Sequence, residues 1–465
     1  MKPLTLAEIR RLTIAADLPD GNGYLEIGSV STDTRQIAPK SLFIALRGDR
    51  FDGHDFLDQA ARNGAAAAIV DHVPENSPAG LSLVKVADTR RAMALLATHV
   101  RRQMRGKVIA VAGSNGKTGT KHLIDSVLRD TLHGTISPKS FNNDIGVPLG
   151  IFPADPEQDY LVLELGTNHP GEIRTLTKIA QPDIAVITNC SAEHLEGLGD
   201  LAGVRRENAS LLEGICPGGS LVVNGDDLDL LQEVANFRGD CITFGRSSGN
   251  EIFASKMRCD WNGVHFTVEP GGVEAFVPLL GQHTAVNALA AVAVGRIMGL
   301  SDRQIVRSLA TASGPDMRLQ RIEICGVRIL NDAYNANPAS MKAAIETLAG
   351  LPAPRKIAVL GDMRELGDAS EECHREIGRF VAQKCPPDML ICVGASAAII
   401  ASEATKAGMP PARVAHFVDA KSASVMAQRV MPGDLVLLKG SRAMGLESIA
   451  KAIERGIAPP LAAAS

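Results

Sequence analysis

The chain has 465 residues, of which 45% are hydrophobic, 22% are charged and 3% are aromatic, and its formal net charge is −4. This length is greater than that of one ordinary domain with a single hydrophobic core, and it predicts about three domains. The weak negative charge and the scarcity of aromatic rings argue against nucleic-acid binding. No apolar run approaches the ~18 residues that would span a bilayer.

The eight cysteines are scattered, and none forms a C-x-x-C pair. They are expected to be reduced, buried thiols, as in a cytoplasmic protein. The first residues, MKPLTLAEIRRL, lack the apolar core of a signal peptide. We therefore expect a cytoplasmic monomer without membrane insertion. A short basic cluster is interpreted as a solvated helix end; its members are Arg101, Arg102, Arg105 and Lys107.

Three segments are predicted, 1–84, 85–317 and 318–465. The first has a helical start, the run SVSTDTRQIAPKSLFIAL, and an apolar strand near its end. The second opens with a helix, and apolar strand-like runs then alternate with helices, which predicts a largely parallel α/β sheet. The third repeats that alternation and predicts a smaller doubly wound domain. The strands expected in the second and third segments are 160–165, 184–188, 220–223, 241–244, 356–360, 389–393 and 435–439.

Residues 108–120 read VIAVAGSNGKTGT and carry the strongest signal in the chain. An apolar strand leads into a small-residue turn, then Lys-Thr, then a helix. Backbone N–H groups of such a turn bind phosphate, the lysine adds charge, and the threonine hydroxyl can ligate Mg²⁺. The strict G-x-x-x-x-G-K-[ST] pattern fails at Val111, so a plain strand–helix turn stays an alternative. The predicted loop consists of Gly113, Ser114, Asn115, Gly116, Lys117, Thr118 and Gly119.

Two further candidates lie where predicted strands end. Glu164 ends YLVLEL, and a carboxylate at the carboxyl edge of a parallel sheet can bind Mg²⁺ beside a phosphate loop. His194 follows IAVITN in NCSAEHLEGLG, and a neutral imidazole can ligate a metal or orient a phosphate. The alternatives are a capping acid for Glu164 and a surface hydrogen-bonding histidine for His194.

Polar clusters follow other strands. FNNDIGVPLG contains Asn142, Asn143 and Asp144, which are interpreted either as ligand contacts or as a helix N-cap at Asn143 or Asp144. NDAYNANPASM, residues 331–341, holds more hydrogen-bonding groups than a simple turn needs. GDMRELG, residues 361–367, and LKGSRAMGLE, residues 438–447, are expected to line the same rim.

Together, these motifs resemble the Mur ligase family over nearly the whole length. The run beginning STDTRQIAPKSLFIALRGDRFDGHDF resembles the N-terminal domain of the family, and GSNGKT resembles its ATP loop. ELGTNHPGEI, AEHLEGLG, GQHTAVNALAA, YNANPASM, GDMRELG and KGSRAMGLE follow in family order. The resemblance implies a UDP-sugar-binding N-terminal α/β domain, a central P-loop ATPase domain with a parallel sheet, and a C-terminal Rossmann-like domain that binds the incoming dipeptide.

The NNDIGVP and NPASM segments favour the branch that adds D-alanyl-D-alanine to UDP-MurNAc-tripeptide in peptidoglycan precursor synthesis. The implied reaction is an ATP- and Mg²⁺-dependent amide ligation through an acyl phosphate. Two alternatives stay open. One is another amide ligase of the superfamily, MurE-like or folylpolyglutamate synthase-like, although no D-N-P-R run is present. The other is a nucleotide-binding module without catalysis.

The resemblance also implies residue roles. Lys117, Glu164 and His194 are expected to be catalytic, with Thr118 and Glu164 serving a first Mg²⁺ and His194 a second. Asn287 is expected at adenine, Asp332 at the ribose and Arg318 at the phosphates. The residues expected to face the two substrates are Ser31, Asp33, Arg35, Lys40, Asn142, Asn143, Asp144, Asn335, Asn337 and Ser340.

One position departs from the family pattern. Many Mur ligases carry a CO₂-modified lysine on the helix after the histidine motif, and the aligned residue here is Asn208. No lysine lies between Lys178 and Lys256. Glu207 is adjacent, but one step along a helix turns a side chain by about 100°. We therefore expect no carbamate at this site.

Overall fold

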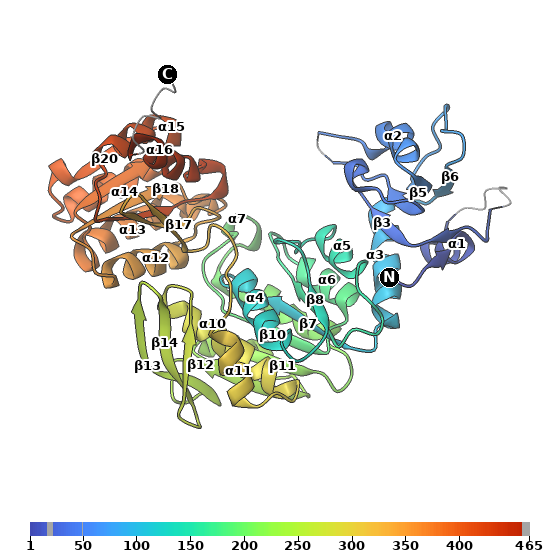
Figure 1. Ribbon diagram of the computed structural model, residues 1–465, viewed down its shortest axis with the longest axis horizontal. Coiled ribbons are helices and arrows are strands. Elements are labelled where there is room, and N and C mark those ends of the chain that lie inside the picture. The colour runs from blue at the N-terminus through green and yellow to red at the C-terminus, as the bar shows by residue number, and fades with distance from the viewer. Residues whose placement is uncertain (16–21, 49, 458–465) are drawn as a thin grey trace, which may run out of the picture.

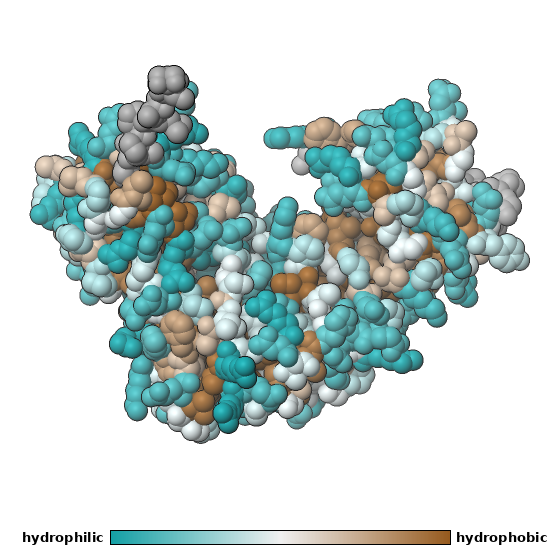
Figure 2. Space-filling model, in the orientation of Figure 1, coloured by the Kyte–Doolittle hydropathy of each residue, from teal (hydrophilic) through white to brown (hydrophobic). Residues whose placement is uncertain are grey.

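The computed structural model describes residues 1–15, 22–48 and 50–457. Figure 1 shows three α/β units, with the N-terminal and C-terminal units rising as two arms from the central one. In the same orientation, Figure 2 shows a deep notch between the arms. The predicted three-domain α/β architecture is confirmed. Within the described ranges, none of the helices combines the length and the apolar character that a bilayer crossing needs.

The N-terminal unit is built on a small parallel sheet. Its strands, in spatial order, are β3 (Ser29–Ser31), β4 (Ser41–Ile44), β5 (Ala65–Val70) and β6 (Ser82–Lys85). A two-stranded antiparallel ribbon stands beside it, made of β1 (Leu4–Thr5) and β2 (Glu26–Ile27). The helices are α1 (Leu6–Thr13), α2 (Leu57–Arg62) and α3 (Thr89–Gln103), and α3 leads into the central unit.

The central unit holds a nine-stranded sheet. Its strands, in spatial order, are β15 (Val273–Val277), β14 (Gly263–Glu269), β13 (Ile252–Asp260), β12 (Asp240–Gly245), β11 (Ser220–Asn224), β10 (Ile184–Ile187), β7 (Lys107–Ala112), β9 (Tyr160–Glu164) and β8 (Gly134–Ile136). The pairs from β8 to β13 are parallel, as predicted. The antiparallel meander β13–β14–β15 was not predicted.

Alternate residues of β7 enter different cores. Val108, Ala110 and Ala112 pack into one apolar cluster, and Ile109 and Val111 pack into another on the opposite face. A strand buried on both faces reads as a continuous apolar run. The covering helices are α4 (Lys117–Leu128), α5 (Gly146–Ile151), α6 (Glu172–Ala180), α7 (Leu195–Leu198), α8 (Leu201–Ala209), α9 (Leu228–Val234), α10 (Gln282–Ile297) and α11 (Asp302–Leu309).

The C-terminal unit holds a six-stranded sheet. Its strands, in spatial order, are β16 (Gln320–Ile324), β17 (Val327–Asp332), β21 (Asp434–Lys439), β18 (Arg355–Gly361), β19 (Met389–Val393) and β20 (Val414–Phe417). Only β16 runs antiparallel to its neighbour among these described strands. The helices are α12 (Pro338–Gly350), α13 (Ser370–Lys384), α14 (Ala397–Lys406), α15 (Ala420–Ala423) and α16 (Glu447–Ile457).

The basic cluster at the end of α3 is only partly solvated. Arg101 is 6% exposed, and its guanidinium donates to the carbonyls of Ala180 and Gln181 and to Asp183. The interpretation as a solvated helix end is therefore wrong for Arg101, which ties α3 to the end of α6.

Candidate active site

The loop between β7 and α4 has a conformation that depends on two glycines. Gly113 has φ +123° and Gly116 has φ +82°. A Cβ on Gly113 would lie 2.2 Å from Oγ1 of Thr188, and one on Gly116 would lie 2.7 Å from Oδ1 of Asn287. At both positions glycine is therefore required for two reasons: the backbone conformation, and the lack of space for a side chain. The helix begins at Lys117, so the Lys-Thr pair that was expected before the helix forms its first two residues.

The loop is braced by the residues that follow β10. Oγ1 of Thr188 donates to the carbonyl of Asn115 at 2.7 Å, and the Asn189 side chain contacts the same residue through its amide and its oxygen. Ser114 exchanges hydrogen bonds with Ser191. This bracing sets the loop geometry before any ligand binds.

Thr118 and Glu164 meet beneath the loop. Oγ1 of Thr118 donates to Oε2 of Glu164 at 2.8 Å, and Nδ2 of Asn142 donates to Oε1 at 3.0 Å. Nζ of Lys121 lies 3.7 Å from Oε2 of Glu164. Three segments distant in sequence thus converge on one buried carboxylate.

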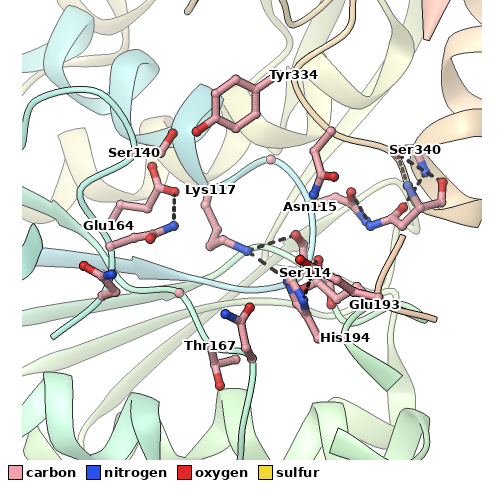
Figure 3. Close-up of a pocket in the computed structure, with 18 of the residues that line it drawn as sticks. Ser114, Asn115, Lys117, Ser140, Glu164, Thr167, Glu193, His194, Tyr334 and Ser340 are labelled. Atoms are coloured by element: carbon pink, nitrogen blue, oxygen red, sulfur yellow. Dashed lines mark hydrogen bonds and ion pairs between the residues drawn. The ribbon is translucent and has the colours of Figure 1, made fainter. Parts of the chain in front are cut away.

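Lys117 and Glu193 form the other half of the site (Figure 3). Nζ of Lys117 donates to the carbonyls of Gly113 and Ser114 and lies 3.8 Å from Oε1 of Glu193. Burial raises the pKa of the Glu193 carboxyl, and the charge of Lys117 opposes that shift. The contacts of Nζ with these three residues are therefore all to oxygen atoms.

A cavity of about 740 Å³ opens above these groups, between the central and C-terminal units. Of the predicted residues, the structure brings Asn142, Asn143, Asp144, Glu164, His194, Arg318, Asp332, Asn335, Asn337 and Ser340 to its wall, with Ser114, Asn115, Gly116 and Lys117 of the loop. Such a volume lies within the range of small-molecule sites in proteins.

A smaller pocket of about 260 Å³ continues from the loop toward α10. Gly119, Asn287, Arg318 and Asp332 line it. The Asp332 carboxylate forms an ion pair with Nζ of Lys439 at 2.8 Å. The Arg318 guanidinium lies over the Tyr334 ring, 4.3 Å from its centroid. A partly apolar pocket beside such a loop suits a nucleotide base and ribose.

Several predicted contact residues already have partners within the protein. Asn143 accepts from the backbone N–H of Gly146 at 2.8 Å, and Asp144 pairs with Arg90. The N-cap position of α5 is Ile145, so the predicted cap at Asn143 or Asp144 is wrong in position. Asn337 and Ser340 form the capping box of α12. Nδ2 of Asn337 also donates to Oδ1 of Asn115 at 2.9 Å, joining the C-terminal unit to the loop.

The four predicted residues of the N-terminal unit lie apart from this site. Asp33 caps a short 3₁₀ turn and pairs with Arg35, Oγ of Ser31 donates to the carbonyl of Asp33, and Lys40 has φ +62°. None of these described side chains lines either cavity.

Sequence reasoning named neither Lys121 nor Glu365 as a site residue and gave Glu193 no role. Lys121 lies one turn after Lys117 on α4, so helical spacing could have flagged it. Glu193 precedes His194 and is 6% exposed. Glu365, in GDMRELG, lies with Oε2 2.7 Å from Nδ1 of His194. That last contact joins two domains, and no local pattern reveals it.

Asn208, the residue at the modified-lysine position, is buried and donates to the carbonyl of Val204.

The site next to the loop suits a magnesium ion. Thr118 and Glu164 supply hard oxygen donors, which Mg²⁺ prefers, and Mg²⁺ keeps most of its shell for water and phosphate oxygens. Among the described residues, the one cluster of three or more His, Cys, Asp or Glu side chains with metal-binding spacing is His54, Asp71 and His72, in the N-terminal unit. Arg47 contacts both Asp71 and His72 there, which disfavours a cation.

A glycine-containing turn with Lys-Thr at the carboxyl edge of a parallel sheet, facing a second α/β domain across a polar cavity, is typical of enzymes that bind a nucleoside triphosphate. Three Mur ligase domain families match the chain: the family described as "Mur ligase family, catalytic domain" over residues 26–101, the middle domain over 111–295 and the glutamate ligase domain over 317–442. The chain belongs to the Mur ligase family, within its MurF branch.

Relatives support this placement along nearly the whole length. The UDP-N-acetylmuramoyl-tripeptide–D-alanyl-D-alanine ligase of Bacillus subtilis (strain 168) is 37% identical, with 91% of this chain and 93% of that protein covered. A MurF crystal structure from Acinetobacter baumannii superposes with a TM-score of 0.87 at 31% identity, covering 98% and 99%. MurF from Thermotoga maritima, in complex with ADP, gives 0.81 at 29% identity, covering 92% and 97%.

Proposed function

We propose that this protein joins D-alanyl-D-alanine to UDP-MurNAc-tripeptide at the expense of ATP. The observation that carries the proposal is that Lys117 and Glu164 line a cavity whose opposite wall belongs to the C-terminal unit, while Thr118 donates to Glu164 at 2.8 Å. The full-length similarity to ligases of that name supports the choice of substrates.

The proposed chemistry matches the charges on the cavity wall. The terminal carboxylate of the tripeptide attacks the γ-phosphorus, the bond to ADP breaks, and the amine of the dipeptide then displaces phosphate from the acyl phosphate. Because the first step joins two anions, positive charge must stand where they meet. Lys117 supplies that charge from the loop, and Arg318 faces the same space from the domain junction.

Thr118 and Glu164 would hold a Mg²⁺ ion, which neutralises phosphate charge when bound. His194 is proposed to contact the transferred phosphate or a second ion. Asn287 and Asp332 are proposed for the base and ribose, because they line the smaller pocket. An acyl phosphate would hydrolyse in open water, so approach of the C-terminal unit must exclude water during turnover.

Coupled turnover tests the proposal. Phosphate release should require ATP, UDP-MurNAc-tripeptide and D-alanyl-D-alanine together, with the diaminopimelate and lysine tripeptides compared side by side. Release with glutamate or diaminopimelate as acceptor would point instead to another branch of the family. No release with any pair, alongside tight nucleotide binding, would favour a module without catalysis.

Lys117→Ala is expected to lower the rate of ATP cleavage at least about 100-fold, because one preorganised charge at the transferred group is lost. The matched control is Lys178→Ala, which removes an exposed charge from α6 of the same unit and should leave turnover unchanged. Retained cleavage in Lys117→Ala would refute the assigned loop.

The remaining assignments stand as proposals. We propose the domain bounds 1–84, 85–317 and 318–465, and a uridine nucleotide site near Ser31, Asp33, Arg35 and Lys40. We further propose that the protein is a cytoplasmic monomer. Analytical ultracentrifugation can test this by measuring its mass in solution.

A further inference from the structure

We infer that Glu365, in the C-terminal unit, is a positioning residue that orients His194 of the central unit. The consequence is that His194 is set for reaction only when the two units are docked. Only the kinetic test of this inference rests on the proposed function.

The two side chains meet across the domain boundary. Oε2 of Glu365 lies 2.7 Å from Nδ1 of His194, while Nε2 of His194 has its nearest carboxylate, Glu193, at 3.9 Å. The imidazole is 16% exposed and the Glu365 side chain is 58% exposed. The histidine therefore lies in the wall of the cavity, and the glutamate reaches it from outside.

Both residues have strained backbones. His194 has φ +49° and Glu365 has φ +64°. Left-handed conformations are costly for residues other than glycine and persist where the surroundings impose them. The two residues with this backbone conformation are the same two whose side chains contact each other.

A second contact fixes the two loops against each other. Gly367 packs against the start of α7, where an added Cβ would lie 3.3 Å from Cα of Glu196. The loop from Glu365 to Gly367 thus covers the turn that carries His194. Withdrawal of the C-terminal unit would remove the carboxylate and this packing together.

The carboxylate selects one form of the imidazole. A neutral imidazole carries its proton on one nitrogen, and the partner of that nitrogen decides which. A carboxylate beside Nδ1 favours the Nδ1–H tautomer and leaves the Nε2 lone pair toward the cavity. Nδ1 makes no hydrogen bond in this conformation. Oε2 of Glu365, at 2.7 Å, is within hydrogen-bond distance of Nδ1 but is not aligned with it.

The kinetic test compares Glu365→Ala and Glu365→Gln with Asp368→Asn, which removes the same charge from an exposed position of the same loop. Loss of a carboxylate that orients a functional histidine costs about 10–100-fold. We expect kcat to fall by that factor in both Glu365 variants, with the KM for ATP unchanged, and Asp368→Asn to match the wild type. A kcat in both Glu365 variants equal to that of the wild type would overturn the inference.

A second measurement needs no substrate. Histidine-selective ¹⁵N spectra report the tautomer of each of the 11 histidines, and His194→Gln identifies the resonance. The Nδ1–H form of His194 should dominate in the wild type and in Asp368→Asn, and should lose that dominance in Glu365→Ala. The same tautomer populations with and without Glu365 would overturn the inference. A protein that shows the tautomer change but no turnover would contradict the proposed function alone.

Discussion

Lys121 is the least expected residue of the site. Its side chain is fully buried, and Nζ donates to the carbonyls of Ser137 and Lys139 and to Oγ of Ser137. Burial lowers the pKa of Lys121, and the charge of Glu164 opposes that shift. A lysine is almost never fully buried unless its charge is matched. It anchors the segment before Asn142 and lends positive charge to Glu164.

Lys121→Met is expected to destabilise the central sheet by about 1–3 kcal/mol at pH 7, because buried carbonyls lose their donor. Native-state hydrogen exchange of β7 and β9 amides measures this. The control Lys107→Met removes a half-exposed lysine 3.2 Å from Asp183 and should cost at most about 1 kcal/mol. Equal losses in the two variants would contradict the anchoring role.

The same lysine predicts a pH dependence. Because the folded-state pKa is lowered, the folded protein releases this proton at a lower pH than the unfolded chain does. Between the two pKa values the unfolded chain binds more protons, so stability rises with pH there. The window ends near the ordinary lysine pKa of about 10.4. Lys121→Met should lose that alkaline rise, and an identical slope in both proteins would speak against it.

At the scale of single residues, the sequence predicted those groups that sit in a contiguous motif. Lys117 and Thr118 open α4 and Glu164 ends β9, where helix and strand signals are strong, and the structure brings Thr118 and Glu164 into contact. Lys121 and Glu365 were missed because their roles depend on partners from other segments. Distance along the chain carries no information about those partners.

At the scale of elements, the start of α6 is governed by a side chain from α8. The Glu207 carboxylate accepts from the backbone N–H groups of Gly171 at 2.7 Å and Ile173 at 2.8 Å. Helix starts leave such donors unpaired, and a carboxylate there also suits the helix dipole. Glu207 is therefore committed to ordering the loop 166–172, part of the cavity wall, rather than to replacing a carbamate.

Glu207→Ala should therefore loosen that loop. Loss of a helix cap costs about 0.5–2 kcal/mol, which corresponds to roughly 2- to 30-fold faster amide exchange at Gly171 and Ile173. Glu213→Ala is the matched control, because Glu213 pairs with Arg174 of the same helix at the surface. Protection at Gly171 and Ile173 that survives in Glu207→Ala would show that other contacts order the loop.

Strands were predicted well at contiguous apolar runs, including the half-exposed β12, and the mostly buried β14 was missed together with β13. The predicted range 389–393 matches β19, and 160–165 differs from β9 by one residue. The meander over residues 252–277 escaped prediction because β13 is half exposed and carries mixed polar residues over KMRCD. This segment has no continuous apolar run, and the other strands were predicted from such runs.

At the scale of the whole molecule, the tip of this meander joins the central and C-terminal units. Trp261, the single tryptophan of the chain, lies between β13 and β14 and donates from Nε1 to Glu323 at 2.5 Å. Arg321 of β16 donates to the carbonyls of Trp261, Asn262 and Pro278. Arg328 stands 5.1 Å from the indole. None of these residues lines the cavity, so this contact is an attachment between the two units separate from the site.

The tryptophan makes that attachment measurable. Arg321→Ala removes three charge-assisted hydrogen bonds, which are stronger than neutral ones, so the hairpin should separate from the C-terminal unit more often. We expect red-shifted emission and greater quenching by acrylamide, because the half-buried indole meets more water. Arg303→Ala, an exposed position on α11, is the control and should change neither. If the emission of Arg321→Ala equals that of the wild type, the indole is held by its own packing, and the guanidinium does not tie the units together.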